Sequence, residues 1–140
     1  MASKHLTIRM DPDSFDRLDR ESRRQRVTRS ELARTLLEEG LRMEAHPGIV
    51  FRDGPAGRRP GLRNGADVWE VVGAFPPDKV TEAGIAHVVK TMALGEWQVR
   101  DAMRYYFEFQ DEIDAWMRMV EEEAERAKAI WLREQRAVGD

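Results

Sequence analysis

The sequence predicts a mainly α-helical protein, in which one short strand and two helices precede a small helical bundle with a long C-terminal helix. Three observations predict this class. Polar and apolar residues alternate near the N-terminus, which is the period of a strand. Helix-capping residues precede several apolar stripes of helical spacing. A stretch rich in Gly and Pro, residues 46–66, separates the two halves.

The composition excludes several classes of protein. The 140 residues contain no cysteine, which rules out a disulfide scaffold, a thiolate zinc site and a thiol nucleophile. No apolar run is long enough to span a membrane, and the first ten residues lack the apolar core of a signal peptide, so we expect a cytoplasmic protein. The net charge of −3 hides an asymmetry: residues 1–66 carry +4 and residues 67–140 carry −7. A basic front half can face a polyanion; the alternative is that both halves are ordinary solvated surface.

The front of the chain begins with an alternating segment. Leu6, Ile8 and Met10 alternate with polar residues, which predicts a half-buried strand over residues 5–10. Asp11 and the proline that follows it end this strand, because they favour the start of a helix.

Two helices follow the strand. The first is predicted over residues 12–25, with Asp11 as its N-cap. Thr28 and Glu31 have the spacing of a capping box, which predicts a second helix over residues 28–43.

The rest of the chain reads as a connecting segment and a helical domain. Ile49–Phe51 suggests a short strand, and the remainder of residues 46–66 reads as loop. We expect Gly95 to break two helices apart and Asp111 to cap the last helix. Helices are predicted over residues 67–72, 78–93, 96–108 and 111–136. In the last helix, apolar residues repeat every three or four positions over about three heptads: Ile113, Met117, Val120, Ala124, Ala127 and Trp131. The domains are thus residues 1–45, 46–66 and 67–140.

Aromatic residues of the second half are expected in the core rather than as stacking platforms. They are Trp69, Trp97, Tyr105, Tyr106, Phe107 and Phe109.

The front half is too small to bury a core alone, and its strand has a bare edge. Both problems are solved if two chains intertwine and their strands pair antiparallel. The outer face of this two-stranded ribbon then presents His5, Thr7 and Arg9 from each chain. A β-ribbon fits the major groove of DNA, where Arg can bind guanine through two hydrogen bonds. The alternatives are a dimerisation module that binds no DNA and, for His5, an ordinary surface position.

Phosphate contacts are expected beside the ribbon. A helix N-terminus binds anions, so the candidates are Lys4, Thr28, Arg29 and Ser30. Four arginines of the connecting segment are candidates for additional DNA contacts: Arg52, Arg58, Arg59 and Arg63. The alternative for Arg58 and Arg59 is that they bind carboxylates within the bundle and hold the loop in place.

Residues 4–43 closely resemble the ribbon-helix-helix family of DNA-binding repressors and antitoxins. The resemblance rests on the stretches Leu6–Met10 and Val27–Leu37 and on the spacing between them. It implies an obligate homodimer that reads bases through alternate strand residues and anchors phosphates at the start of the second helix. Many members have Gly in the turn between the helices, where this chain has Arg26.

The second half resembles, over about residues 46–117, an uncharacterised bacterial antitoxin-type helical domain. The matching features are the Gly-Arg-Arg-Pro turn at 57–60, the Val-Trp at 68–69, and residues 102–106 and 111–116. The family is often encoded beside a nuclease-type toxin. We therefore expect a DNA-binding transcriptional regulator, acting as a repressor, that forms a homodimer or higher even oligomer on a double-stranded operator. The alternative is an antitoxin whose C-terminal domain neutralises a toxin protein, with DNA binding serving autoregulation.

No enzyme is expected. His5, His46 and His87 lie far apart in the sequence, and neither a phosphate-binding loop nor a nucleophile elbow occurs. We expect no catalytic residue, no metal site and no cofactor.

Overall fold

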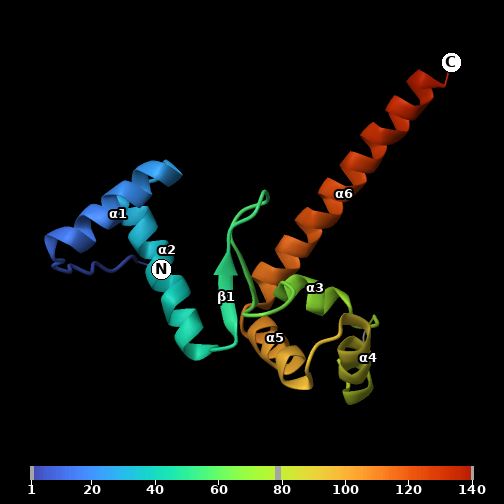
Figure 1. The fold of residues 1–140 in the computed structure, drawn as a ribbon, viewed down its shortest axis with the longest axis horizontal. Coiled ribbons are helices and arrows are strands. Elements are labelled where there is room, and N and C mark those ends of the chain that lie inside the picture. Colours follow the sequence, from blue (N-terminus) through green and yellow to red (C-terminus); the bar gives the residue numbers. More distant parts are fainter. Residues whose placement is uncertain (1, 78–79, 140) are drawn as a thin grey trace. The chain divides into compact units, whose positions relative to one another are not determined.

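The computed structural model describes residues 2–77 and 80–139, and the chain divides into two units, Met1–Ala45 and His46–Asp140. As predicted, the described part of the chain is mainly helical; it also contains one two-stranded antiparallel sheet (Figure 1). The first unit holds α1 (Pro12–Gln25) and α2 (Arg29–Ala45). The second holds β1 (Ile49–Arg52), β2 (Arg59–Leu62), α3 (Val68–Gly73), α4 (Glu82–Met92), α5 (Glu96–Glu108) and α6 (Gln110–Val138).

The two helices of the first unit lie where the capping residues predict them. The Asp11 carboxylate accepts a hydrogen bond from the Ser14 amide (3.1 Å), and Pro12 is the first residue of α1. Residues 2–10, by contrast, form no strand in the single chain, so the prediction of a strand over 5–10 is not met there. A strand requires a partner, and within the described residues none pairs with this segment.

The turn between α1 and α2 has a left-handed residue at Arg26, with φ 58° and ψ 40°. The Val27 amide donates to the Ser22 carbonyl (3.0 Å), and the Arg26 amide donates to the Arg23 carbonyl (3.2 Å). These bonds satisfy carbonyls that the end of α1 would otherwise leave unpaired. A non-glycine residue in this conformation is strained, because its Cβ approaches the following carbonyl.

The second unit begins with a hairpin, of which the sequence predicted only the first strand. β1 and β2 pair antiparallel with Ile49 opposite Leu62 and Arg52 opposite Arg59. The prediction of a loop over residues 59–62 is wrong. No local signal marks this strand, because its Arg-Pro-Gly-Leu stretch shows neither alternation nor strand-favouring residues. Ile49 and Leu62 are fully buried, which fixes the hairpin to the core.

The core of the second unit lies between the hairpin and helices α3–α6. Its members are Ile49, Leu62, Val68, Val71, Ile85, Val88, Val99, Ala102, Met103, Tyr105 and Ile113. The segment 46–66 therefore packs as part of this unit rather than as a loop between domains.

Helix boundaries in this unit depart from prediction at the start of α4 and at the N-cap of α6. α4 begins at Glu82, because the Thr81 hydroxyl caps it by accepting a hydrogen bond from the Gly84 amide (3.1 Å). The helix was predicted to begin at residue 78, and residues 78–79 lie outside the described residues. α4 ends at Met92, one residue before its predicted end, and its C-cap Ala93 is left-handed (φ 55°). Gly95, which was expected to separate two helices, is the N-cap of α5.

The N-cap of α6 is Phe109, so the prediction that Asp111 caps the helix is wrong. The Phe109 amide still bonds the Tyr105 carbonyl at the end of α5, and its own carbonyl accepts from Ile113. α6 therefore starts directly after α5.

Two aromatic side chains also depart from expectation. Trp97 and Phe107 are 64% and 57% exposed, because they lie outside the face of α5 that packs against the core. The other four aromatics of that group are buried or half-buried. Over the described residues, every helix falls short of the length or the apolar content that a bilayer crossing demands.

Candidate nucleic-acid interface

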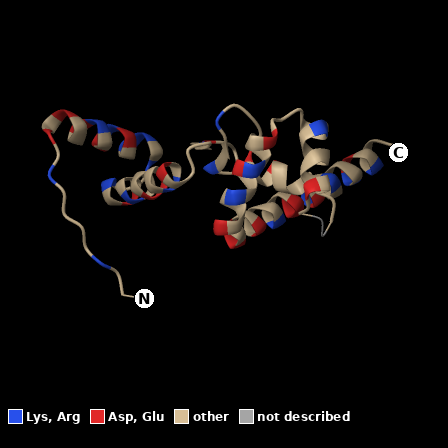
Figure 2. Cartoon of the chain, turned by 90° about the horizontal axis from the view of Figure 1, so that it is seen from below, with Lys and Arg blue, Asp and Glu red and all other residues tan. Residues whose placement is uncertain are grey.

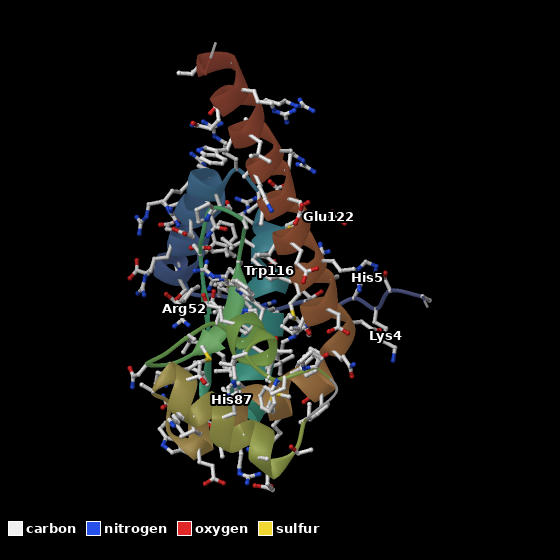
Figure 3. All side chains as sticks on the ribbon, turned by 90° about the vertical axis from the view of Figure 1, so that its right-hand side faces the viewer. Lys4, His5, Arg52, His87, Trp116 and Glu122 are labelled. Carbon is white, nitrogen blue, oxygen red and sulfur yellow. The ribbon has the colours of Figure 1, made fainter. Side chains whose placement is uncertain are left out.

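The candidate base-reading residues lie on the extended N-terminal segment. His5, Thr7 and Arg9 are exposed, as is Lys4 beside them. Figure 3 shows Lys4 and His5 projecting from this segment. The apolar residues that alternate with them are exposed too: Leu6 is 74%, Ile8 60% and Met10 45% accessible. Both faces of the segment are thus uncovered in the single chain.

The start of α2 is organised by Thr28 and Glu31, as the capping box predicts. The Thr28 amide donates to Glu31 Oε2 (3.0 Å), and the Glu31 amide donates to Thr28 Oγ1 (3.1 Å). The bond from the Thr28 amide, followed by that from its side chain, holds the pKa of Glu31 below its usual value. The first turn of α2 is therefore ordered before any ligand arrives.

Two further candidates, Arg29 and Ser30, lie within this turn. Arg29 Nη1 lies 3.1 Å from Asp19 Oδ1, and its guanidinium stands over the Phe15 ring, 4.9 Å from the centroid. Ser30 is exposed. An exposed ion pair of this kind is worth at most about 1 kcal/mol, so Arg29 can exchange Asp19 for a phosphate at little cost.

The first unit leaves most of its apolar surface uncovered. Among its described residues, the one fully buried apolar side chain is Leu32. A shallow groove of about 350 Å³ runs beside it, lined by Met10, Ser14, Arg17, Leu18, Glu21, Leu32 and Leu36. Eight large apolar residues of this unit are exposed: Leu6, Ile8, Met10, Phe15, Val27, Leu36, Leu37 and Leu41. Surface of this extent on so small a unit is typical of an interface.

The arginines of the hairpin are engaged within the second unit. Arg52 donates to Asp67 Oδ1 (3.2 Å) and to the carbonyls of Leu62 (2.8 Å) and Gly65 (3.0 Å). Arg59 pairs with the other oxygen of the same carboxylate. Asp67 is buried, so the two guanidiniums neutralise a charge that burial would otherwise penalise.

Two glycines make room for these guanidinium groups. A Cβ on Gly54 would overlap the Arg59 guanidinium, and a Cβ on Gly61 would overlap that of Arg52. For Arg59, this arrangement agrees with the alternative that the side chain binds a carboxylate and holds the loop in place.

The remaining two hairpin arginines are more accessible. Arg58 lies 3.2 Å from Asp53, and Arg63 donates to the Pro47 carbonyl (3.2 Å). Arg52 and Arg59 are bound to the buried Asp67, whereas the contacts of Arg58 with Asp53 and of Arg63 with Pro47 lie at the surface.

Sequence reasoning missed two polar centres. Asp67, which also accepts from Trp69 Nε1 (3.3 Å), appears in the sequence only as the first residue of the helix predicted over residues 67–72. His46 is buried and lies 2.6 Å from Glu108 across 62 positions of sequence, with Tyr105 edge-on to its ring. No local signal marks either contact, because both join residues that only the fold brings together. Over residues 2–77 and 80–139, no group of three or more potential metal-ligating side chains occurs.

No protein-family model matches the chain, and neither a curated protein nor a solved structure matches it.

Proposed function

We propose that the protein is a sequence-specific DNA-binding transcriptional regulator that acts as a dimer of its first unit. The observation that carries this proposal is the uncovered apolar surface of residues 2–45, with a single buried apolar residue, Leu32, among those described. A 45-residue unit with so little interior is not stable alone. A second copy of the same unit is the simplest partner that covers this surface.

Pairing of the N-terminal segments explains the alternation. In an antiparallel ribbon, Leu6, Ile8 and Met10 turn towards the helices and complete a shared core, in which the groove beside Leu32 takes part. His5, Thr7 and Arg9 then lie on the opposite face, from both chains. A ribbon with these groups outward has the width and the donors needed to read base edges in the major groove.

The start of α2 supplies the phosphate contacts in this proposal. Its positive dipole end and the side chains of Arg29 and Ser30 favour an anion, and Lys4 adds a flexible cation near the ribbon. Phosphate contacts fix the orientation of the protein, and the ribbon supplies sequence preference.

Selection of bound sequences from random duplexes, followed by gel-shift titration, tests the proposal. Arg9→Ala is expected to lower affinity for the selected duplex at least about fivefold, the low end of the value of a bidentate base contact. Its residual, sequence-independent binding should remain. Arg20→Ala, which removes an exposed arginine from α1, is the matched control and should bind as the wild type does. Unchanged sequence preference in Arg9→Ala would overturn the assignment.

A further inference from the structure

The C-terminal half of α6 extends past the body of the second unit. Residues 121–138, named here the α6 tail, are exposed throughout, whereas Ile113 near the start of the helix is buried. Figure 1 shows this part of α6 running beyond α3 and α5. The tail carries three consecutive large apolar residues, Ile130, Trp131 and Leu132, which are 49%, 55% and 39% exposed.

The apolar seam of α6 continues from the packed half into the tail. Met117 and Val120 are half-buried near α3, and Ala124, Ala127 and Trp131 follow at spacings of four, three and four residues. These positions share one helix face. The seam thus joins a packed end to an uncovered end, and its two alanines permit the close approach of another helix.

A cavity lies where the packed half ends. Its volume is about 370 Å³, and it is lined by Trp69, Glu70, Gly73, Ala74, Met117, Val120 and Glu121. The lining combines apolar walls with two carboxylates, which suits an indole ring and its N–H donor.

Charge is divided along the tail. Residues 121–125 contain four glutamates, and residues 126–138 contain four basic residues and one glutamate. Figure 2 shows basic residues towards the end of α6 marked C. Each half of the tail is therefore complementary to the other half, and two tails attract each other most when they run in opposite directions.

We propose that the α6 tails of two copies of this chain pack antiparallel, each placing Trp131 in the cavity between α3 and α6 of the other copy. The register that sets Trp131 against the partner's Val120 also sets Ala124 against the partner's Ala127. It places Lys128 beside the partner's Glu121, because these two positions lie on the same flank of the seam, seven residues apart. This interface is separate from the proposed dimer of the first unit.

Parallel packing satisfies the same seam less well. It sets the four glutamates of residues 121–125 beside their own copies, which is repulsive. It also places Trp131 against Trp131 and leaves the cavity beside Val120 open.

Cross-linking of the full chain tests the proposal, since the natural chain has no cysteine. Ala124→Cys and Ala127→Cys are coexpressed as two chains that differ in mass, and disulfides are formed under mild oxidation. Antiparallel packing predicts that the mixed 124–127 disulfide predominates, several-fold over either same-residue disulfide. Glu122→Cys, on the outer face of α6, coexpressed with Ala127→Cys is the control and should give little mixed product (Figure 3).

Charge reversal provides the second arm. Lys128→Glu should lower the yield of the mixed disulfide several-fold, and adding Glu121→Lys should restore it. Arg133→Glu makes the same change in net charge on the outer face and should leave the yield unchanged. Predominant same-residue disulfides would show that the two tails pack parallel. Absence of any disulfide would show that two copies of the chain do not pack through α6. Either result overturns the proposal. Operator binding is measured separately, so neither result bears on the proposed function.

Discussion

The Asp67 carboxylate holds the hairpin of the second unit through Arg52, whose Nη2 lies 3.2 Å from Asp67 Oδ1. The second carboxylate oxygen is taken by Arg59, and Asp67 itself is buried at the start of α3. One carboxylate thus joins both strands of the hairpin to the first helix that follows them. This contact accounts for the fixed position of a segment that sequence composition describes as loop.

Asp67→Asn should destabilise the second unit. The substitution keeps the shape of the side chain and removes its charge, which leaves two guanidinium groups without their counter-ion. We expect a loss of about 2 kcal/mol, the scale of a hydrogen bond to a charged group. Urea unfolding followed by tryptophan fluorescence measures it, because all four tryptophans lie in the second unit. Asp53→Asn, at an exposed pair with Arg58, is the control and should unfold as the wild type does.

Arg26→Gly should stabilise the first unit. Arg26 has φ 58°, a conformation that glycine adopts without the strain of a Cβ. The expected gain is about 1 kcal/mol, seen as a higher midpoint of thermal unfolding by circular dichroism. Arg26→Ala retains the Cβ and should show no comparable gain. Equal thermal midpoints for the wild type, Arg26→Gly and Arg26→Ala would contradict the presence of backbone strain at Arg26.

Acid should weaken α1 through Glu21. Hydrogen bonds from Arg24, and then from Gln25, lower the pKa of Glu21 from 4.5 to about 2. A lowered folded-state pKa means that the stabilisation is fully present above pH 4.5 and is lost as the pH falls towards 2. The difference in unfolding midpoint between wild type and Glu21→Gln should therefore be largest above pH 5 and shrink below it. A difference independent of pH would exclude this cause.

Removing a phosphate contact should act on all DNA sequences alike. Lys4→Ala is expected to weaken selected and random duplexes by the same factor. It should also reduce the slope of log affinity against log salt by about one per chain. Gel-shift titrations at several salt concentrations measure both quantities. A loss of affinity for the selected duplex alone would contradict phosphate binding by Lys4 and would indicate that Lys4 contacts bases.

Local signals predicted the helices well. Asp11 and Thr28 cap helices through their own first turns, so neighbouring residues suffice to place them. The cap at Thr81 was missed, because the helix was expected to begin at residue 78. β2 was missed because it owes its conformation to pairing with β1 and to the burial of Leu62, not to its own residues.

The candidate site also contains residues that local sequence signals describe and residues whose contacts depend on the fold. His5, Thr7 and Arg9 are exposed in the single chain, but so are Leu6, Ile8 and Met10. The alternation therefore stays a prediction, because a strand there depends on a second chain. The contacts of Arg52 and Arg59 with Asp67 depend on how the hairpin folds against α3, and composition showed only a cluster of basic residues. Sequence periodicity therefore predicts least well the contacts between side chains that lie far apart in the sequence.

The most direct test of the central claim is nuclear magnetic resonance on a mixture of isotope-labelled and unlabelled chains. If two copies pair through residues 5–10, filtered spectra will contain backbone contacts between strands of different chains, in an antiparallel pattern. Sedimentation will then give at least a dimer. A monomer in solution, with residues 5–10 lacking any contact between chains, would contradict the account.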